Sequence, residues 1–291
     1  MKTVTDNLKC IADDIQNLLE DLLLKHSSIY LWNTPGGSVV FVSASGNYSY
    51  NKLNEEGRQI QAKLLEEYRR FYSLLIVLLK KQPKNTLEKL SRLDKVLTNT
   101  IEQNNTWCKN TQEAFEEAVQ ALRSEFELLN RLFDSSEEES IYVPDTNALL
   151  YNPKIESWAF QGISKFTILL LPSVLSELDL LKINHRNENV RKKAETIIRK
   201  IKEFRRRGKL TEIVTVVKNK IMIQAMAIEP DMKTTLQWLD PDNNDDRILA
   251  GVIEIMRVRP RSLVTAVSRD INFQNKAEFA AVPYEEPPEP V

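Results

Sequence analysis

The stretch "IYVPDTNALLYNP", residues 141–153, decides the fold of the C-terminal half of the chain. Strand-forming residues 141–143 lead through a proline to a carboxylate, Asp145, and a polar pair, Thr146 and Asn147, follows before the chain turns apolar again. A charged side chain at the end of a buried strand caps the following helix or belongs to a ligand site. The second explanation requires further carboxylates elsewhere in the sequence.

Strands alternate with helical spacing after residue 141. The runs "FTILLLP" at 166–172 and "SLVTAVS" at 262–268 are almost continuously apolar, which is typical of strands buried on both faces of a parallel sheet. Two more strand-like runs, "EIVTVV" and "KIMIQAM", occupy 212–226 and predict an edge hairpin. This half is therefore predicted to be an α/β domain with a central, mainly parallel sheet.

The first half shows helical periodicity. Apolar residues recur at helical spacing over 7–25, 52–81, 85–103 and 109–133, and the Gly- and Ser-rich island at 34–51 predicts a loop or small hairpin. The acidic run "DSSEEES" is typical of a linker, and the Pro-rich end "EEPPEPV" of a disordered tail. We therefore predict a mainly α-helical domain at 1–133, a linker at 134–140, the α/β domain at 141–285 and a disordered tail at 286–291.

Composition excludes several classes of protein. The 291 residues include only 7 glycines, and no Gly-rich phosphate loop is present. The run "FYSLLIVLL" at 71–79 is far shorter than the roughly 20 apolar residues of a membrane helix. Two cysteines are too few for a disulfide framework or a cysteine zinc site, and they suit a reducing cytoplasm.

Three further acids are predicted to lie near Asp145. Asp270 follows the strand at 262–268, and carboxyl ends of parallel strands share one edge of a sheet. Glu177 lies in the first turns of the helix after "TILLL", on its apolar stripe, so we expect a positive group opposite it. Asp245 is predicted to face inward at the start of the next helix, with Asp246 turned about 100° away.

Four carboxylates at one edge repel each other, and a divalent cation removes that repulsion. Mg²⁺ prefers carboxylate, water and phosphate oxygens, which suits metal-assisted phosphodiester hydrolysis. Each acid taken alone also has a structural explanation, since a carboxylate near a helix start stabilises the helix. The combination is what favours a catalytic site.

The segments "VPDTNALL", "LPSVLSELDLLK", "NNDDRILA" and "VSRDINFQNKA", in this order, resemble the PIN domain family of metal-dependent ribonucleases over residues 141–285. The resemblance implies a three-layer α/β fold and an endonuclease that leaves a 5′-phosphate and a 3′-hydroxyl. It implies that Asp145, Glu177, Asp245 and Asp270 are catalytic and hold one or two Mg²⁺ or Mn²⁺ ions. It also places substrate-binding polar residues beside them: Thr146, Asn147, Ser268 and Asn272.

A basic segment lies at residues 182–209, with 12 Lys or Arg against 3 Glu. Such a segment is usually a solvated helix face, but beside an acidic metal site it would also attract a phosphate backbone. Arg205, Arg206 and Arg207 at the end of its helical pattern are therefore candidate RNA contacts.

Several alternatives remain open at this point. The same chemistry would serve a nuclease for DNA or for a structured junction, and the chain could be a scaffold or a toxin controlled by its helical half. The helical half carries 17 basic against 21 acidic residues up to position 140 and is a candidate surface for a homo-oligomer or a protein partner. The leading prediction is a single-strand-specific endoribonuclease.

Overall fold

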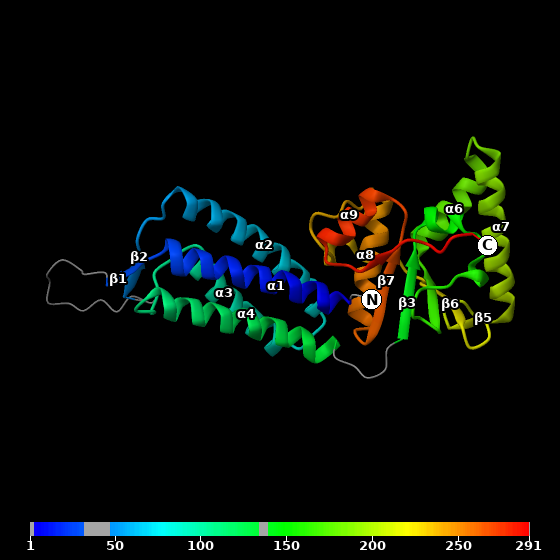
Figure 1. Cartoon of the computed structure of the whole chain (residues 1–291). Coiled ribbons are helices and arrows are strands. Elements are labelled where there is room, and N and C mark those ends of the chain that lie inside the picture. The colour runs from blue at the N-terminus through cyan, green and yellow to red at the C-terminus, as the bar shows by residue number, and fades with distance from the viewer. Residues whose placement is uncertain (1–2, 32–46, 134–138, 291) are drawn as a thin grey trace. The chain divides into compact units, whose positions relative to one another are not determined.

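The computed structural model describes residues 3–31, 47–133 and 139–290 (Figure 1). Two compact units are formed, one by Leu8–Leu132 and the other by Phe133–Val291 together with Met1–Asn7. The predicted loop at 34–51 and the predicted linker lie largely outside the described residues.

The first unit is helical, as predicted. Its helices are α1 (Val4–Glu20), continued by wider π-helical turns over Asp21–His26, α2 (Glu55–Leu79), α3 (Lys84–Ile101) and α4 (Thr111–Phe133). Pro83 stands at the N-cap of α3, because proline cannot continue α2 but tolerates a helix start. A short antiparallel pair, β1 (Ile29–Leu31) with β2 (Tyr48–Tyr50), completes the unit.

A six-stranded sheet forms the centre of the second unit, in the order β5-β6-β4-β3-β7-β8. Its strands are β3 (Glu139–Pro144), β4 (Phe166–Leu170), β5 (Val214–Val217), β6 (Ile221–Ala225), β7 (Ser262–Val267) and β8 (Tyr284–Glu285). All neighbours pair in parallel except β5 and β6, so the predicted edge hairpin and the mainly parallel sheet are confirmed. All residues of β4 are buried, which explains its continuous apolar run.

Helices connect the strands. They are α5 (Thr146–Tyr151), α6 (Pro172–Asn184), α7 (Glu188–Arg207), α8 (Asn244–Val258) and α9 (Ile271–Phe279), with short 3₁₀ turns at Ile155–Ser157 and Met232–Thr234. The α6–α7 pair lies toward the β5 side of the sheet, and α8 and α9 lie toward β7 (Figure 1).

A glycine sets the distance between α8 and the start of α6. A Cβ added at Gly251 would lie 2.7 Å from Cδ1 of Leu171, which is the N-cap residue of α6. The absence of a side chain at this position lets the two helices approach closely. This approach brings the first turn of α8 toward Glu177 on α6.

Residues 286–290, for which a disordered tail was predicted, lie against the second unit in the structure. β8 pairs with β7, and the chain then crosses the strands toward the α6–α7 side (Figure 1). Pro287 is buried, and the side-chain amide of Asn152 donates a hydrogen bond of 3.0 Å to the Pro288 carbonyl. Proline-rich composition removes backbone donors, but the remaining carbonyls can still be bound by side chains.

Candidate active site

Asp145 lies at the carboxyl end of β3, in the centre of the sheet. It is the N-cap of α5, and its Oδ1 accepts a hydrogen bond of 2.6 Å from the amide of Ala148. The side chain is 2% exposed. The predicted capping role is therefore real, and it leaves the second carboxylate oxygen for other contacts.

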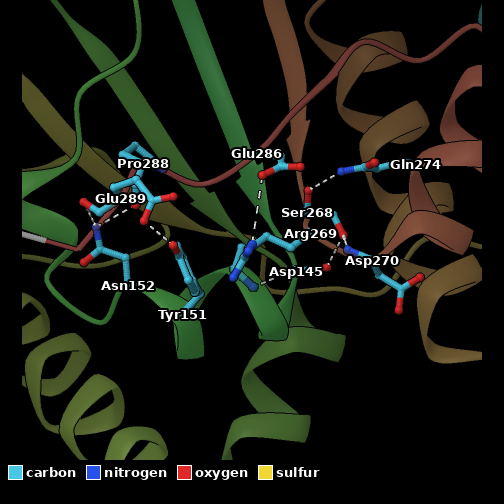
Figure 2. A network of polar contacts seen from close by, with 11 residues as sticks. Asp145, Tyr151, Asn152, Ser268, Arg269, Asp270, Gln274, Glu286, Pro288 and Glu289 are labelled. Carbon is cyan, nitrogen blue, oxygen red and sulfur yellow. Dashed lines mark hydrogen bonds and ion pairs between the residues drawn. The ribbon is translucent and has the colours of Figure 1, made fainter.

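The end of β7 lies directly beside Asp145, since Pro144 pairs with Val267. The buried hydroxyl of Ser268 donates to Oδ2 of Asp145 and accepts a hydrogen bond of 3.0 Å from the amide of Asp270 (Figure 2). Asp270 in turn caps α9, with Oδ1 accepting from the amides of Asn272 at 2.7 Å and Phe273 at 3.1 Å. One serine thus joins the acids that end two neighbouring strands.

Glu177 faces neutral donors rather than the positive group that we expected. Its Oε2 accepts hydrogen bonds from the Thr146 hydroxyl at 2.6 Å and from the Asn244 side-chain amide at 2.5 Å. The carboxylate is half-buried, so retained contact with water lowers the cost of its charge. Asn244 was missed as a site residue, although its position just before Asp245 at a helix start pointed to it.

The predicted orientations of Asp245 and Asp246 were wrong. Asp246 is 4% exposed, whereas Asp245 is half-buried. Asp246 accepts hydrogen bonds from Lys276 Nζ and from the amide of Asp240, at 2.5 and 2.9 Å. Helix α8 is buried over most of its surface, so its apolar pattern did not define a single inward face.

The four predicted acids are coupled electrostatically. The pKa of Asp145 is raised to about 6, mainly by burial. Hydrogen bonds from Ser268 and Ala148 lower this pKa, and the charges of Asp245 and Glu177 raise it. Burial also raises the pKa of Asp245, the charges of Asp270 and Glu177 add to the shift, and the charge of Lys276 opposes it. Among the described residues, no lysine or arginine forms an ion pair with any of the four.

A family model for the PIN domain matches residues 142–287 of the chain. The chain belongs to the PIN domain family. No curated protein matches it. The PIN domain is a nuclease-type fold that usually depends on divalent metal ions, and its nucleases bind nucleic acids.

The acids of this PIN domain suit a divalent ion in the chemistry of their donors. Within the described residues, no group of three or more His, Cys, Asp or Glu side chains is arranged to hold a metal ion. Mg²⁺ is commonly held by one or two carboxylates, with water and substrate phosphate completing its ligands. Oxygen donors that repel one another fit such a site, although the charge of Lys276 partly offsets the repulsion at Asp245.

The remaining predicted residues divide into two groups. Thr146 and Ser268 lie in the acid cluster, each hydrogen-bonded to one of its acids. The side chains of Asn147 and Asn272 are exposed. Their predicted substrate contacts remain predictions.

The basic segment of the PIN domain forms α7, and its arginines 205–207 are exposed at the C-terminal end. Three residues later, the carbonyl of Leu210 accepts a hydrogen bond of 2.6 Å from the amide of Ala225. Ala225 ends β6 and pairs with Leu170, which ends β4. The chain after α7 therefore reaches the carboxyl edge of the sheet, where the acids also lie.

No helix within residues 3–31, 47–133 and 139–290 combines the length and apolarity that a membrane span requires.

Proposed function

We propose that this PIN domain is an Mg²⁺- or Mn²⁺-dependent endoribonuclease that hydrolyses phosphodiester bonds of single-stranded RNA. The observation that carries the proposal is the hydrogen-bond network that links the acids at the carboxyl edge of the sheet. Ser268 joins Asp145 to the amide of Asp270, and Glu177 accepts from Thr146 and Asn244, the neighbours of Asp145 and Asp245. Open α/β sheets bind their ligands at this edge.

The four acids differ in how firmly their side chains are held in position. Asp145 and Asp270 are held by helix caps and by Ser268, so their positions are set by backbone hydrogen bonds. Glu177 and Asp245 are half-buried side chains on helices, and they can adjust to an ion between them and Asp145. A bound divalent ion would supply charge neutralisation at the phosphate and lower the pKa of water. The four acids would hold it, and no covalent intermediate is required.

The basic end of α7 supports a nucleic acid substrate, and RNA is proposed from the resemblance to PIN domain ribonucleases. A single-stranded backbone running along the carboxyl edge from the acids would reach the segment after Arg205, Arg206 and Arg207, and cations there would bind its phosphates. Thr146, Asn147, Ser268 and Asn272 are proposed to support or contact the substrate beside the acids.

The helical unit is proposed to mediate self-association or to bind a protein partner. Tyr30, Leu31 and Trp107 are 44%, 54% and 55% exposed. They belong to one end of the unit, because β1 pairs with β2 and Tyr48 of β2 bridges to Thr106. Apolar side chains gathered at one place are typical of interaction surfaces. We place the protein in the cytoplasm, where its cysteines stay reduced.

A circular single-stranded RNA tests the proposal, because only an endonuclease can open a molecule without ends. Purified full-length chain should linearise it with Mg²⁺ or Mn²⁺ and leave it intact with EDTA. A circular single-stranded DNA of the same sequence is the matched substrate. Equal or faster opening of the DNA would contradict RNA specificity, and no cleavage of either substrate would contradict nuclease activity.

A further inference from the structure

The C-terminal segment after β8 crosses the edge of the sheet beside the acid cluster (Figure 2). At its start, the amide of Ser268 donates a hydrogen bond of 3.1 Å to the carbonyl of Glu285. Further along, the fully buried Asn152 donates to the carbonyl of Pro288 at 3.0 Å. The segment is therefore anchored through its main chain, and its glutamate side chains are not needed to hold it.

These glutamates lie on a pair formed by Arg269 and Tyr151. The guanidinium of Arg269 lies 3.8 Å from the centroid of the Tyr151 ring, a cation–π contact that orients the charged group. Its Nε is 4.0 Å from Oε2 of Glu286, and the Tyr151 hydroxyl donates to the carboxylate of Glu289 (Figure 2). Both members of the pair thus face carboxylates of one segment.

Arg269 lies next to the acids of the proposed active site. It stands between Ser268, which binds Asp145, and Asp270, which caps α9. A cluster of acids repels a phosphate backbone, so a nearby arginine would offset that repulsion. Arginine binds phosphate and carboxylate through the same planar set of donors.

The contact with Glu286 is of the kind that a substrate could replace. The side chains of Arg269 and Glu286 are 45% and 65% exposed. Solvent-exposed ion pairs with such a long separation contribute little to stability. Because the segment has main-chain anchors, the glutamates can rotate away while the segment stays in place.

We propose that Arg269, held on the ring of Tyr151, binds a backbone phosphate of the nucleic acid substrate, and that Glu286 and Glu289 compete with that phosphate. This inference rests on the proposed nuclease function and adds to it a substrate-binding residue and an internal competitor. The C-terminal segment therefore lowers the affinity of the site for substrate.

The test is binding of a labelled single-stranded oligouridylate to the full-length chain, measured by fluorescence anisotropy with Asp145→Asn in every protein to prevent cleavage. Arg269→Gln should weaken binding about tenfold, which corresponds to about 1.4 kcal/mol. It should also reduce the log–log salt slope by about 0.7, the value for one phosphate contact of a single strand. Glu286→Gln with Glu289→Gln should tighten binding about two- to fivefold, the range that weak exposed pairs allow.

Matched controls make the same charge changes on exposed residues of the helical unit. Arg92→Gln, and Glu66→Gln with Glu127→Gln, should leave the affinity unchanged. If Arg269 only holds the C-terminal segment in place, Arg269→Gln will bind RNA as well as or better than the Asp145→Asn protein. That result overturns the inference. Unchanged or weaker binding by the double glutamine variant overturns the competition.

The two proposals fail in different ways. If the unmutated chain cleaves RNA but Arg269→Gln binds it normally with an unchanged salt slope, the inference is wrong and the nuclease function stands. If the unmutated chain cleaves no nucleic acid, the nuclease function is wrong, and the inference falls with it. Circular dichroism and thermal melting of Arg269→Gln exclude misfolding as the cause of weaker binding.

Discussion

The hydroxyl of Ser268 donates a hydrogen bond to the carboxylate of Asp145, which lies 123 residues earlier in the chain. The same hydroxyl accepts from the amide of Asp270 at 3.0 Å. Ser268 is fully buried, so these contacts are shielded from water. A single side chain thereby holds the ends of β3 and β7 in register at the candidate active site.

Ser268→Ala should raise the divalent metal concentration needed for half-maximal cleavage, by about 10- to 100-fold, the range for partners that orient metal ligands. The reason is that Asp145 loses a donor that orients its outer oxygen. The measurement is cleavage rate against Mg²⁺ and Mn²⁺ concentration. Ser176→Ala, at an exposed position of α6, is the control. An unchanged metal requirement in Ser268→Ala would limit this serine to a structural role.

Asp145→Asn should reduce cleavage by more than about 100-fold, beyond the loss typical of a supporting residue. The fold should persist, because asparagine is also a good N-cap and the change removes a charge that Asp245 and Glu177 oppose. Cleavage assays are paired with thermal melting, and Asp179→Asn, exposed on α6, is the control. A well-folded Asp145→Asn protein with normal cleavage would contradict the catalytic role of the four acids.

Glu125 of α4 should make the stability of the helical unit depend on pH. It is fully buried, its Oε1 accepts from the Tyr68 hydroxyl at 3.1 Å, and its Oε2 has no hydrogen-bond partner among the described residues. Burial raises its pKa from 4.5 to about 8, with Asp94 adding to the shift. Because this folded pKa lies above the unfolded one, the folded state keeps a proton that the unfolded state releases. The stability that Glu125 contributes through this proton is complete below pH 4.5 and is lost as the pH rises to about 8.

Glu125→Gln should therefore unfold at nearly the same urea concentration across that pH range, since a neutral amide takes the place of the protonated acid. The wild-type chain should lose stability over the range with a slope approaching about 1.4 kcal/mol per pH unit. Glu127→Gln, exposed on the same helix, should follow the wild type. Equal pH dependence in Glu125→Gln and wild type would show that Glu125 is charged in the folded state.

Arg205→Ala with Arg206→Ala should weaken binding of single-stranded RNA and reduce its log–log salt slope by up to about 1.4, at about 0.7 for each phosphate contact. Arg207 is left unchanged, because its guanidinium donates to the Val216 carbonyl at 3.4 Å and lies 5.2 Å from the Phe204 ring centroid. Lys63→Ala with Arg92→Ala makes an equal charge change in the helical unit. A salt slope equal to that of wild type would show that Arg205 and Arg206 are only solvated and contact no phosphate.

Trp107→Ser with Leu31→Ser should convert an oligomer of the full-length chain to a monomer, as measured by light scattering. Both side chains are more than half exposed, so their replacement removes apolar surface without opening the core. Ile76→Ser, a partly exposed apolar residue of α2, is the control. A wild-type chain that is already monomeric would contradict self-association and leave a partner protein as the remaining proposal.

Local pattern was sufficient for much of the fold. The apolar runs at 166–172 and 262–268 became β4 and β7, and the proline at 83 separates α2 from α3 as predicted. These features depend on neighbouring residues, because helix and strand periods and the constraints of proline act over a few positions. The place of Asp145 and Asp270 at strand ends followed from the same patterns.

Local pattern did not predict the contacts of segments that are buried from several sides. The first turn of α8 is an example, since Asp246 became the buried acid once Lys276 of α9 and the amide of Asp240 supplied donors. The path of residues 286–290 is another, because it depends on pairing with β7 and on Asn152. Apart from Asp240, these partners lie far along the chain from the residues that they contact.

The sequence by itself thus determined the alternation of strands and helices, the family resemblance and the acids at strand ends. Only the tertiary structure decided that β3 lies between β4 and β7, that Ser268 binds Asp145 and that Asn244 binds Glu177. The physical reason is the range of the interactions. Secondary structure follows from contacts a few residues apart, whereas the order of strands and the partners of buried polar groups minimise the free energy of the whole unit.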